Sequence, residues 1–209
     1  MIKALRLLVL MAAGLFATCA GAQSGVDFAR LMHERLKISP VLKGEFEQTK
    51  TLKGFRNPLV SKGEFLVSRG QGVWWHTRQP FESTLVVTKT RLFTRNADGS
   101  ASDLVDAQAE PGVKQVNELI FSLLAADLDV LADKFTVVAQ PVGASGWTLT
   151  LTPRDANLAK FLVRATLAGE RDVQTVRIDE ARGDTTQIRF SHQVPSRSEE
   201  RRVGKECRP

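Results

Sequence analysis

The sequence predicts a mainly β protein with helices (an α+β fold), in which a curved antiparallel sheet carries its helices on the concave face. Three observations lead to this fold class. Short segments of alternating apolar and polar residues recur between turns rich in Gly, Asn and Pro. Strong helical periodicity is confined to two segments. Ten predicted strands within about 170 residues must curl or close, and two helices cannot cover both faces of such a sheet.

Residues 1–22 have the pattern of a cleavable secretory signal peptide. A short positively charged stretch precedes the apolar segment Leu7–Ala17, which is shorter than the roughly 20 residues of a membrane-spanning helix. The small residues Ala20-Gly21-Ala22 then mark a signal peptidase site, with cleavage expected before Gln23. We therefore expect the mature domain, residues 23–195, to work outside the cytoplasm, in the periplasm.

Cys19 leaves a second kind of N-terminal processing open, because a cysteine after an apolar segment can be acylated and anchor a lipoprotein. The three residues before Cys19 match that acylation pattern poorly, so we favour a released, soluble protein. Cleavage before Gln23 would leave Cys207 as the one remaining cysteine, which excludes an intrachain disulfide.

The formal net charge of +6 is concentrated near the two ends of the chain. Between Gln23 and Pro195 the sequence holds 22 basic and 20 acidic side chains, so we expect no clustered basic face of the kind that binds nucleic acid. The tail at residues 196–209 lacks periodicity and resembles a non-native read-through sequence. We expect it to be disordered and to lie outside the domain.

The first helix is predicted at Gln23–Ile38. Apolar residues at helical spacing place Phe28, Leu31, Met32 and Leu36 on one face, and Pro40 ends the helix. Five short alternating segments separated by turns then predict an antiparallel meander. These strands are expected at Lys43–Lys53, Ser61–Ser68, Val73–Thr77, Ser83–Thr88 and Arg91–Arg95, with a closing loop at Ala97–Ser100.

A second helix is predicted at Val113–Ala126, where six apolar residues recur at helical spacing. Asp127 and Asp129 are expected in the solvated loop at its exit. Five more strands follow, with a short turn near Asp155–Ala159. They are expected at Lys134–Gln140, Gly146–Thr152, Phe161–Leu167, Val173–Asp179 and Thr185–His192.

The sequence contains no convincing catalytic or metal-binding set, and we expect neither an enzyme nor a cofactor. His33, His76 and His192 fall on a helix and two different strands, without metal-ligand spacing to another His, Cys or acid. Nucleotide-binding and serine-hydrolase motifs are absent. In a curved sheet, one indole of the Trp74-Trp75 pair must face the interior.

Several short motifs occur in a recognisable order along residues 26–195. They are Phe46-Glu47-Gln48, Gly63-Glu64-Phe65, Arg69 with Trp75 six residues later, Pro80, a strand with Leu85 and Val86, and the segment Trp147–Pro153. In this order the motifs resemble those of LolA-type outer-membrane lipoprotein carriers. Three features depart from the family: the proline usual after the arginine is absent, Val73 stands where an aromatic residue is usual, and no closing segment with paired prolines and glycine follows His192.

The resemblance implies an unclosed antiparallel barrel with helices as a lid. Its apolar cavity would take the acyl chains of a lipoprotein from an inner-membrane ABC transporter and pass them to an outer-membrane receptor. The family arginine, here Arg69, would hydrogen-bond the lid and hold the empty cavity closed. We expect a monomer whose ligand contacts Phe46, Phe65, Val73 and Trp75 on the strands, and Leu119, Ile120 and Leu123 on the second helix.

Three other functions stay open at this point. A membrane-anchored receptor of the same fold would require acylation of Cys19. An enzyme using the same cavity would lose turnover when His76 is changed. A structural protein with a solid core would bind no hydrophobic probe.

Overall fold

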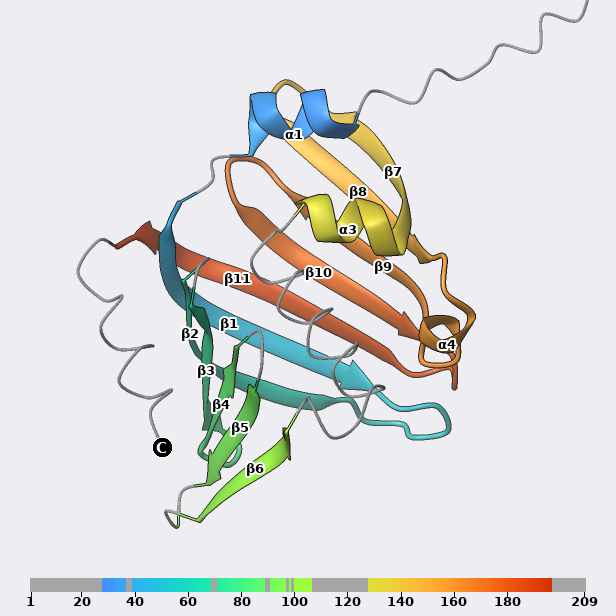
Figure 1. Ribbon diagram of the computed structural model, residues 1–209. Helices are drawn as coiled ribbons and strands as arrows, with labels where there is room; N and C mark the ends of the chain where they lie inside the picture. Colours follow the sequence, from blue (N-terminus) through green and yellow to red (C-terminus); the bar gives the residue numbers. More distant parts are fainter. Residues whose placement is uncertain are drawn as a thin grey trace, which may run out of the picture.

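The computed structural model describes residues 28–36, 39–68, 71–88, 91–96, 98, 100–106 and 128–196 of the chain. Within these residues an 11-stranded antiparallel sheet has the strand order β6-β5-β4-β3-β2-β1-β11-β10-β9-β8-β7 (Figure 1). The strands are β1 (Val41–Thr51), β2 (Leu59–Ser68), β3 (Gly72–Gln79), β4 (Ser83–Val87), β5 (Arg91–Asn96), β6 (Ala101–Asp106), β7 (Phe135–Val142), β8 (Gly146–Pro153), β9 (Leu162–Gly169), β10 (Val173–Glu180) and β11 (Thr185–Pro195).

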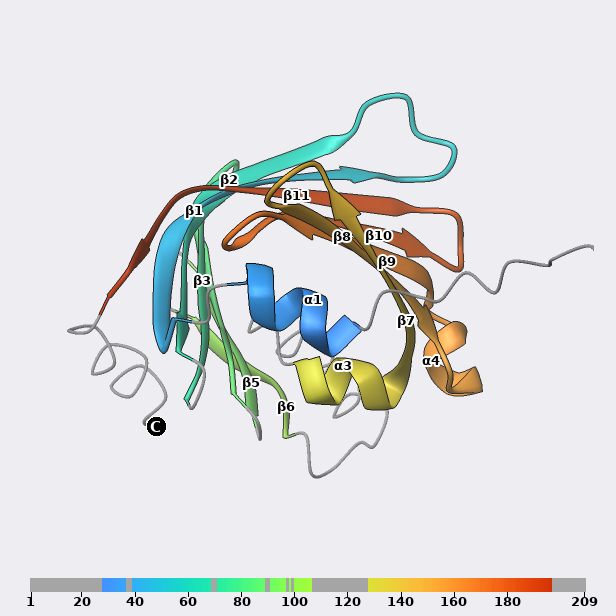
Figure 2. The ribbon, with the colours of Figure 1, turned by 90° about the horizontal axis from the view of Figure 1, so that it is seen from above.

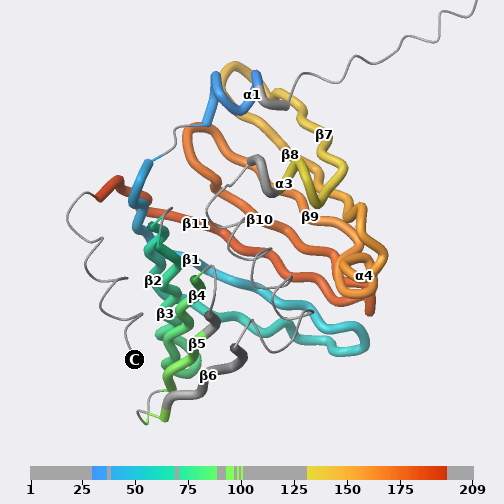
Figure 3. The backbone as a smooth tube through the Cα atoms, in the orientation of Figure 1, coloured from blue at the N-terminus to red at the C-terminus, as the bar shows by residue number. Residues whose placement is uncertain are grey.

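The sheet consists of two meanders that are joined through the pairing of β1 with β11. Figure 3 shows these two strands side by side although they lie at opposite ends of the domain sequence. Phe46 is paired with Phe190 in this register. The strands at the two edges of the sheet, β6 and β7, do not pair with each other. The sheet therefore curves into a barrel that stays open, as predicted.

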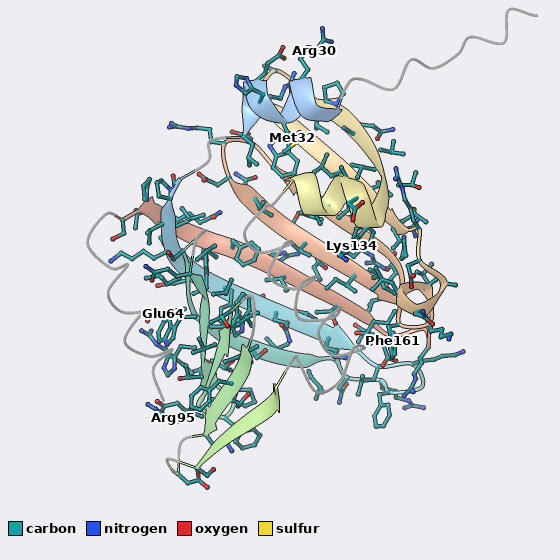
Figure 4. All side chains as sticks on the ribbon, in the orientation of Figure 1. Arg30, Met32, Glu64, Arg95, Lys134 and Phe161 are labelled. Carbon is teal, nitrogen blue, oxygen red and sulfur yellow. The ribbon has the colours of Figure 1, made fainter. Side chains whose placement is uncertain are left out.

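Two helices lie on the concave side of the sheet (Figure 2). They are α1 (Phe28–Arg35) and α3 (Leu128–Lys134), and a third short helix, α4 (Ala156–Ala159), precedes β9. Met32 of α1, labelled in Figure 4, and Leu131 of α3 are each 1% exposed and belong to the main core cluster. The Arg35 guanidinium donates a hydrogen bond to the carbonyl oxygen of Gly146, which holds α1 against the start of β8.

The structure corrects the predicted strand count. It adds β6 after the loop Ala97–Ser100, where the sequence predicts no strand. The sequence of β6 is polar and carries two aspartates, so it has low intrinsic strand propensity. Its pairing with β5 alone makes it an edge strand, where charged residues guard against aggregation.

The segment before β7 also differs from expectation. Asp129 lies in α3 rather than in a loop, and Lys134 ends that helix instead of beginning a strand. The short length of α3 explains why its periodicity was not recognised, although Leu128 and Leu131 are spaced by three residues. The described part of the first helix is Phe28–Arg35. The predicted signal peptide, the helix predicted at Val113–Ala126 and the tail from residue 197 lie outside the described residues.

Candidate functional site

The concave face of the sheet is the candidate site, because apolar side chains from nearly every described strand gather there. Alternate residues of a strand point to the same face, and the inward residues of β1, β2, β3 and β11 that join the core are apolar. The largest core cluster combines these inward residues with side chains of α1 and α3. Several apolar residues that pack against this cluster are only partly buried: Leu42, Trp75, Leu85, Val137, Val173, Ile178 and Phe190.

Four aromatic residues form a continuous cluster across one half of this face. The Phe46 ring stacks on the Trp75 indole with ring centroids 3.7 Å apart. The Phe65 ring meets the Phe190 ring edge to face at 5.0 Å, and lies 6.3 Å from Trp75. The four side chains come from β3, β2, β1 and β11, which are successive strands of the sheet. The cluster therefore links the two meanders on their apolar side.

Two glycines allow these rings to reach across an intervening strand. Gly63 of β2 lies between the strands of Phe46 and Trp75, and a Cβ on it would be 2.9 Å from the Phe46 ring. Gly44 of β1 likewise lies between the strands of Phe65 and Phe190, with its Cβ position 2.9 Å from the Phe65 ring. Each missing side chain leaves a gap that an aromatic ring covers.

A polar group marks one end of the apolar face. Lys50 Nζ lies 3.0 Å from Glu180 Oε1, and the Thr186 hydroxyl donates to the same carboxylate oxygen at 3.2 Å. Lys50 follows Phe46 at an even spacing on β1, and Thr186 precedes Ile188 at an even spacing on β11, so both point to the concave side. An apolar ligand on this face therefore meets a half-buried ion pair at this end.

The structure brings four of the expected ligand-contacting residues together. Phe46, Phe65 and Trp75 form the aromatic cluster, and Val73 is buried in the same core. The other four expected residues lie outside the described part of the chain: Arg69, Leu119, Ile120 and Leu123.

Sequence reasoning missed Phe190. The alternation of Ile188 and Phe190 along β11 indicated that these residues share a face. Placing Phe190 beside Phe65, however, required the pairing of β11 with β1. That pairing joins residues separated by more than half of the chain, and no local pattern specifies it.

The two adjacent tryptophans point to opposite faces, as predicted. Trp75 belongs to the aromatic cluster on the concave side. Trp74 belongs to a second cluster with Val41, Leu66 and Val86 on the convex side, and its ring stacks on His76 at 5.2 Å. The pair therefore provides one indole on each face of the same strand.

Several polar side chains of the described residues pair with one another. His76 Nδ1 lies 3.0 Å from the Thr84 hydroxyl, and His192 Nδ1 lies 3.0 Å from a Glu45 carboxylate oxygen. The Lys62 ammonium, hydrogen-bonded to Glu47 across strands, lowers the pKa of that carboxyl below its usual value. Among the described residues, no three His, Cys, Asp or Glu side chains gather as they would around a metal ion.

Comparison with known proteins gives a family match over most of the chain. A family model described as the outer membrane lipoprotein carrier protein LolA matches residues 39–200. The outer-membrane lipoprotein carrier protein of Dechloromonas aromatica is 26% identical over 161 residues, which cover 77% of this chain and 74% of that protein.

Two solved structures also resemble the fold. A LolA superfamily protein from Nitrosomonas europaea aligns at a TM-score of 0.43 with 8% identity, covering 80% of this chain and 91% of that one. A crystal structure of MucB aligns at 0.49 with 15% identity, covering 88% of this chain and 63% of MucB. In the described part of the chain, every helix is too short or too polar to span a membrane.

Proposed function

Because the chain belongs to the LolA family of outer-membrane lipoprotein carrier proteins, we propose that it is a periplasmic carrier of lipoproteins or of a related lipid. The cargo's acyl chains bind on the concave apolar face of the open barrel. The proposed cycle begins with release of cargo by an inner-membrane ABC transporter and ends at an outer-membrane receptor. The predicted signal peptide at residues 1–22 supplies export.

The observation that carries this proposal is the apolar concave face with its aromatic cluster. Phe46, Phe65, Trp75 and Phe190 cross four neighbouring strands without an intervening polar side chain. Burial of acyl chains is favourable by about 0.8 kcal/mol per methylene group. A surface of rings from successive strands suits a long flexible hydrocarbon, which needs contact area rather than directed hydrogen bonds.

The proposed role is binding rather than catalysis. The carrier description of the family supports it, and so does the chemistry of the concave face. Two ionisable groups on that side, Lys50 and Glu180, pair with each other at 3.0 Å. We propose that this pair bounds the acyl-binding surface.

The adjacent tryptophans allow a direct test of where the cargo binds. A lipopeptide with brominated acyl chains is expected to quench Trp75 fluorescence, because bromine quenches only indoles that it approaches closely. The Trp75→Phe variant should lose most of the quenching on cargo addition. The Trp74→Phe variant is the matched control, since it removes the neighbouring indole on the convex face, and it should retain the quenching.

The same titrations measure affinity. A charge in the aromatic cluster, introduced as Trp75→Asp, should weaken lipopeptide binding at least about tenfold, since it places an unpaired carboxylate against hydrocarbon. Quenching that persists in Trp75→Phe and disappears in Trp74→Phe would place the cargo on the wrong face and refute the proposal. Mass spectrometry of lipids that copurify with the native protein then identifies the cargo.

We further propose that Arg69 controls release. An arginine that holds a lid through a few hydrogen bonds of about 1.5–3 kcal/mol each would let a loaded carrier open at its receptor. The Arg69→Leu variant is therefore expected to accept cargo but to transfer it to the outer-membrane receptor more slowly. Transfer assays with purified receptor measure this rate, and equal rates for variant and wild type would exclude the role.

A further inference from the structure

Three turns at one end of the sheet form a single exposed surface, here called the turn cluster. Its parts are residues 52–58 between β1 and β2, residues 154–161 between β8 and β9, and residues 181–184 between β10 and β11. Figure 1 shows these turns together at the end of the sheet where α4 lies.

Hydrogen bonds connect the three turns directly. The Lys53 backbone N–H donates to Asp184 Oδ1 at 2.8 Å, which ties the first turn to the third. The Ala181 backbone N–H donates to the carbonyl oxygen of Phe161 at 3.0 Å, which ties the third turn to the second. The turn cluster is therefore one connected structure rather than three independent loops.

Large apolar side chains project from the turn cluster into solvent. Phe55 is 69% exposed and Phe161, labelled in Figure 4, is 61% exposed. Leu59, the first residue of β2 and four residues after Phe55, is 60% exposed. Scattered exposed apolar residues are ordinary, but two largely exposed phenylalanines on connected turns require an explanation.

The turn cluster is also basic. It carries five exposed cations against two acids, Asp155 and Asp184. Both acids are engaged locally, because Asp155 accepts from two backbone N–H groups at the start of α4 and Asp184 accepts from that of Lys53. The five cations are Lys53, Arg56, Arg154, Lys160 and Arg182.

These cations are distinguished by their lack of acidic partners. Within the described residues none of the five forms an ion pair, whereas basic residues on the neighbouring strands commonly do. Lys50 pairs with Glu180, Lys62 with Glu47, and Arg164 with Asp179. Positive charge thus accumulates where phenylalanines are exposed.

We propose that the turn cluster binds the surface of an anionic phospholipid membrane. Exposed aromatic side chains insert at the boundary between head groups and acyl chains, while flanking Lys and Arg side chains contact anionic head groups. The combination of exposed phenylalanines and cations at one end of the sheet fits a lipid surface better than nucleic acid, since the domain as a whole is nearly neutral. Membrane contact here is independent of the carrier role and is tested without cargo.

The test measures the partition of the purified mature protein onto vesicles without lipoprotein. Wild type is expected to cosediment with vesicles of phosphatidylcholine and phosphatidylglycerol, more weakly with phosphatidylcholine alone, and less at high salt. Each neutralised cation should lower the partition coefficient about five-fold. The triple variant Lys53→Gln, Arg56→Gln, Arg182→Gln should therefore lose roughly a hundred-fold.

Two matched controls separate the turn cluster from general charge and apolarity. The double variant Phe55→Ser, Phe161→Ser should bind at least about tenfold more weakly, whereas Phe81→Ser, which removes an exposed phenylalanine from the β3–β4 turn, should bind as wild type does. The control triple variant Arg171→Gln, Arg177→Gln, Arg189→Gln neutralises the same number of exposed cations outside the turn cluster. Its partition coefficient should stay within a few-fold of the wild-type value.

Two outcomes would overturn the proposal. The first is a wild-type protein that does not cosediment with vesicles of either composition. The second is an equal loss of binding in the control triple and the turn-cluster triple. That result would show that net charge, and not the position of the cations, determines vesicle binding. Because all substituted side chains are exposed, thermal unfolding of each variant is expected to match wild type.

Discussion

Replacing Gly63 with valine is expected to lower the free energy of unfolding by about 3 kcal/mol and to disrupt the aromatic cluster. A Cβ at this position would lie 1.9 Å from the carbonyl oxygen of His76. Such a contact cannot be tolerated, so β2 must move away from β3. The same Cβ would push the Phe46 ring off Trp75, with loss of a stacked pair that contributes roughly 1 kcal/mol beyond area burial.

Cargo binding on the concave face should weaken together with stability. Urea unfolding measures the loss of free energy, and the brominated-lipopeptide titration measures the loss of cargo binding at Trp75. The Gly54→Asn variant is the control, because no atom lies within 4 Å of a Cβ at Gly54; the φ of 88° strains any side chain, and asparagine adopts positive φ more readily than most residues. It should change stability by less than about 1 kcal/mol. A Gly63→Val protein as stable as wild type would show that β2 and β3 pair differently.

Replacing Trp147 with alanine is expected to lower the free energy of unfolding by about 4 kcal/mol. This side chain is the largest of those that are fully buried in the described residues. Its indole N–H donates to the Glu170 carbonyl oxygen at 2.5 Å, so the substitution also leaves that carbonyl without its partner. Near 1 kcal/mol of the expected loss comes from this hydrogen bond, and the rest from lost packing and the cavity.

Thermal unfolding provides the measurement for Trp147. A loss of 4 kcal/mol corresponds to a decrease in Tm of roughly 8–16 °C in a domain of this size. Trp147→Phe helps to separate the two contributions, since it keeps an aromatic ring in the core and removes the donor together with a smaller part of the packed volume than alanine does. It is expected to lose about 1–2 kcal/mol. Equal losses in the two variants would show that the hydrogen bond, rather than packing, dominates.

Local sequence patterns predicted most of the individual elements. Alternation located ten of the strands, and turn residues separated them, because both signals depend on neighbours within a few residues. The inward orientation of one indole of Trp74-Trp75 followed from the same period of two. The edge strand β6 escaped prediction because its polar sequence has no apolar alternation, and its strand conformation depends on hydrogen bonds from β5.

The sequence predicted only part of the candidate site. Phe46, Phe65 and Trp75 were expected to contact the ligand, and they lie together. Phe190 was not expected, since its place depends on the pairing of the first strand with the last. The roles of Gly44 and Gly63 also needed the structure, because a missing Cβ matters only when a ring from a neighbouring strand occupies its space.

The sequence by itself determined the class of this protein: alternating strands, an amphipathic first helix, and family motifs in order along one domain. These features are encoded locally, in periodicity and turn chemistry. The tertiary structure alone decided which distant residues meet. It joined Phe190 to the aromatic cluster and collected Phe55, Phe161 and Arg182 at one end. The physical reason is that strand order and register follow from hydrogen bonding and packing between segments far apart in the chain.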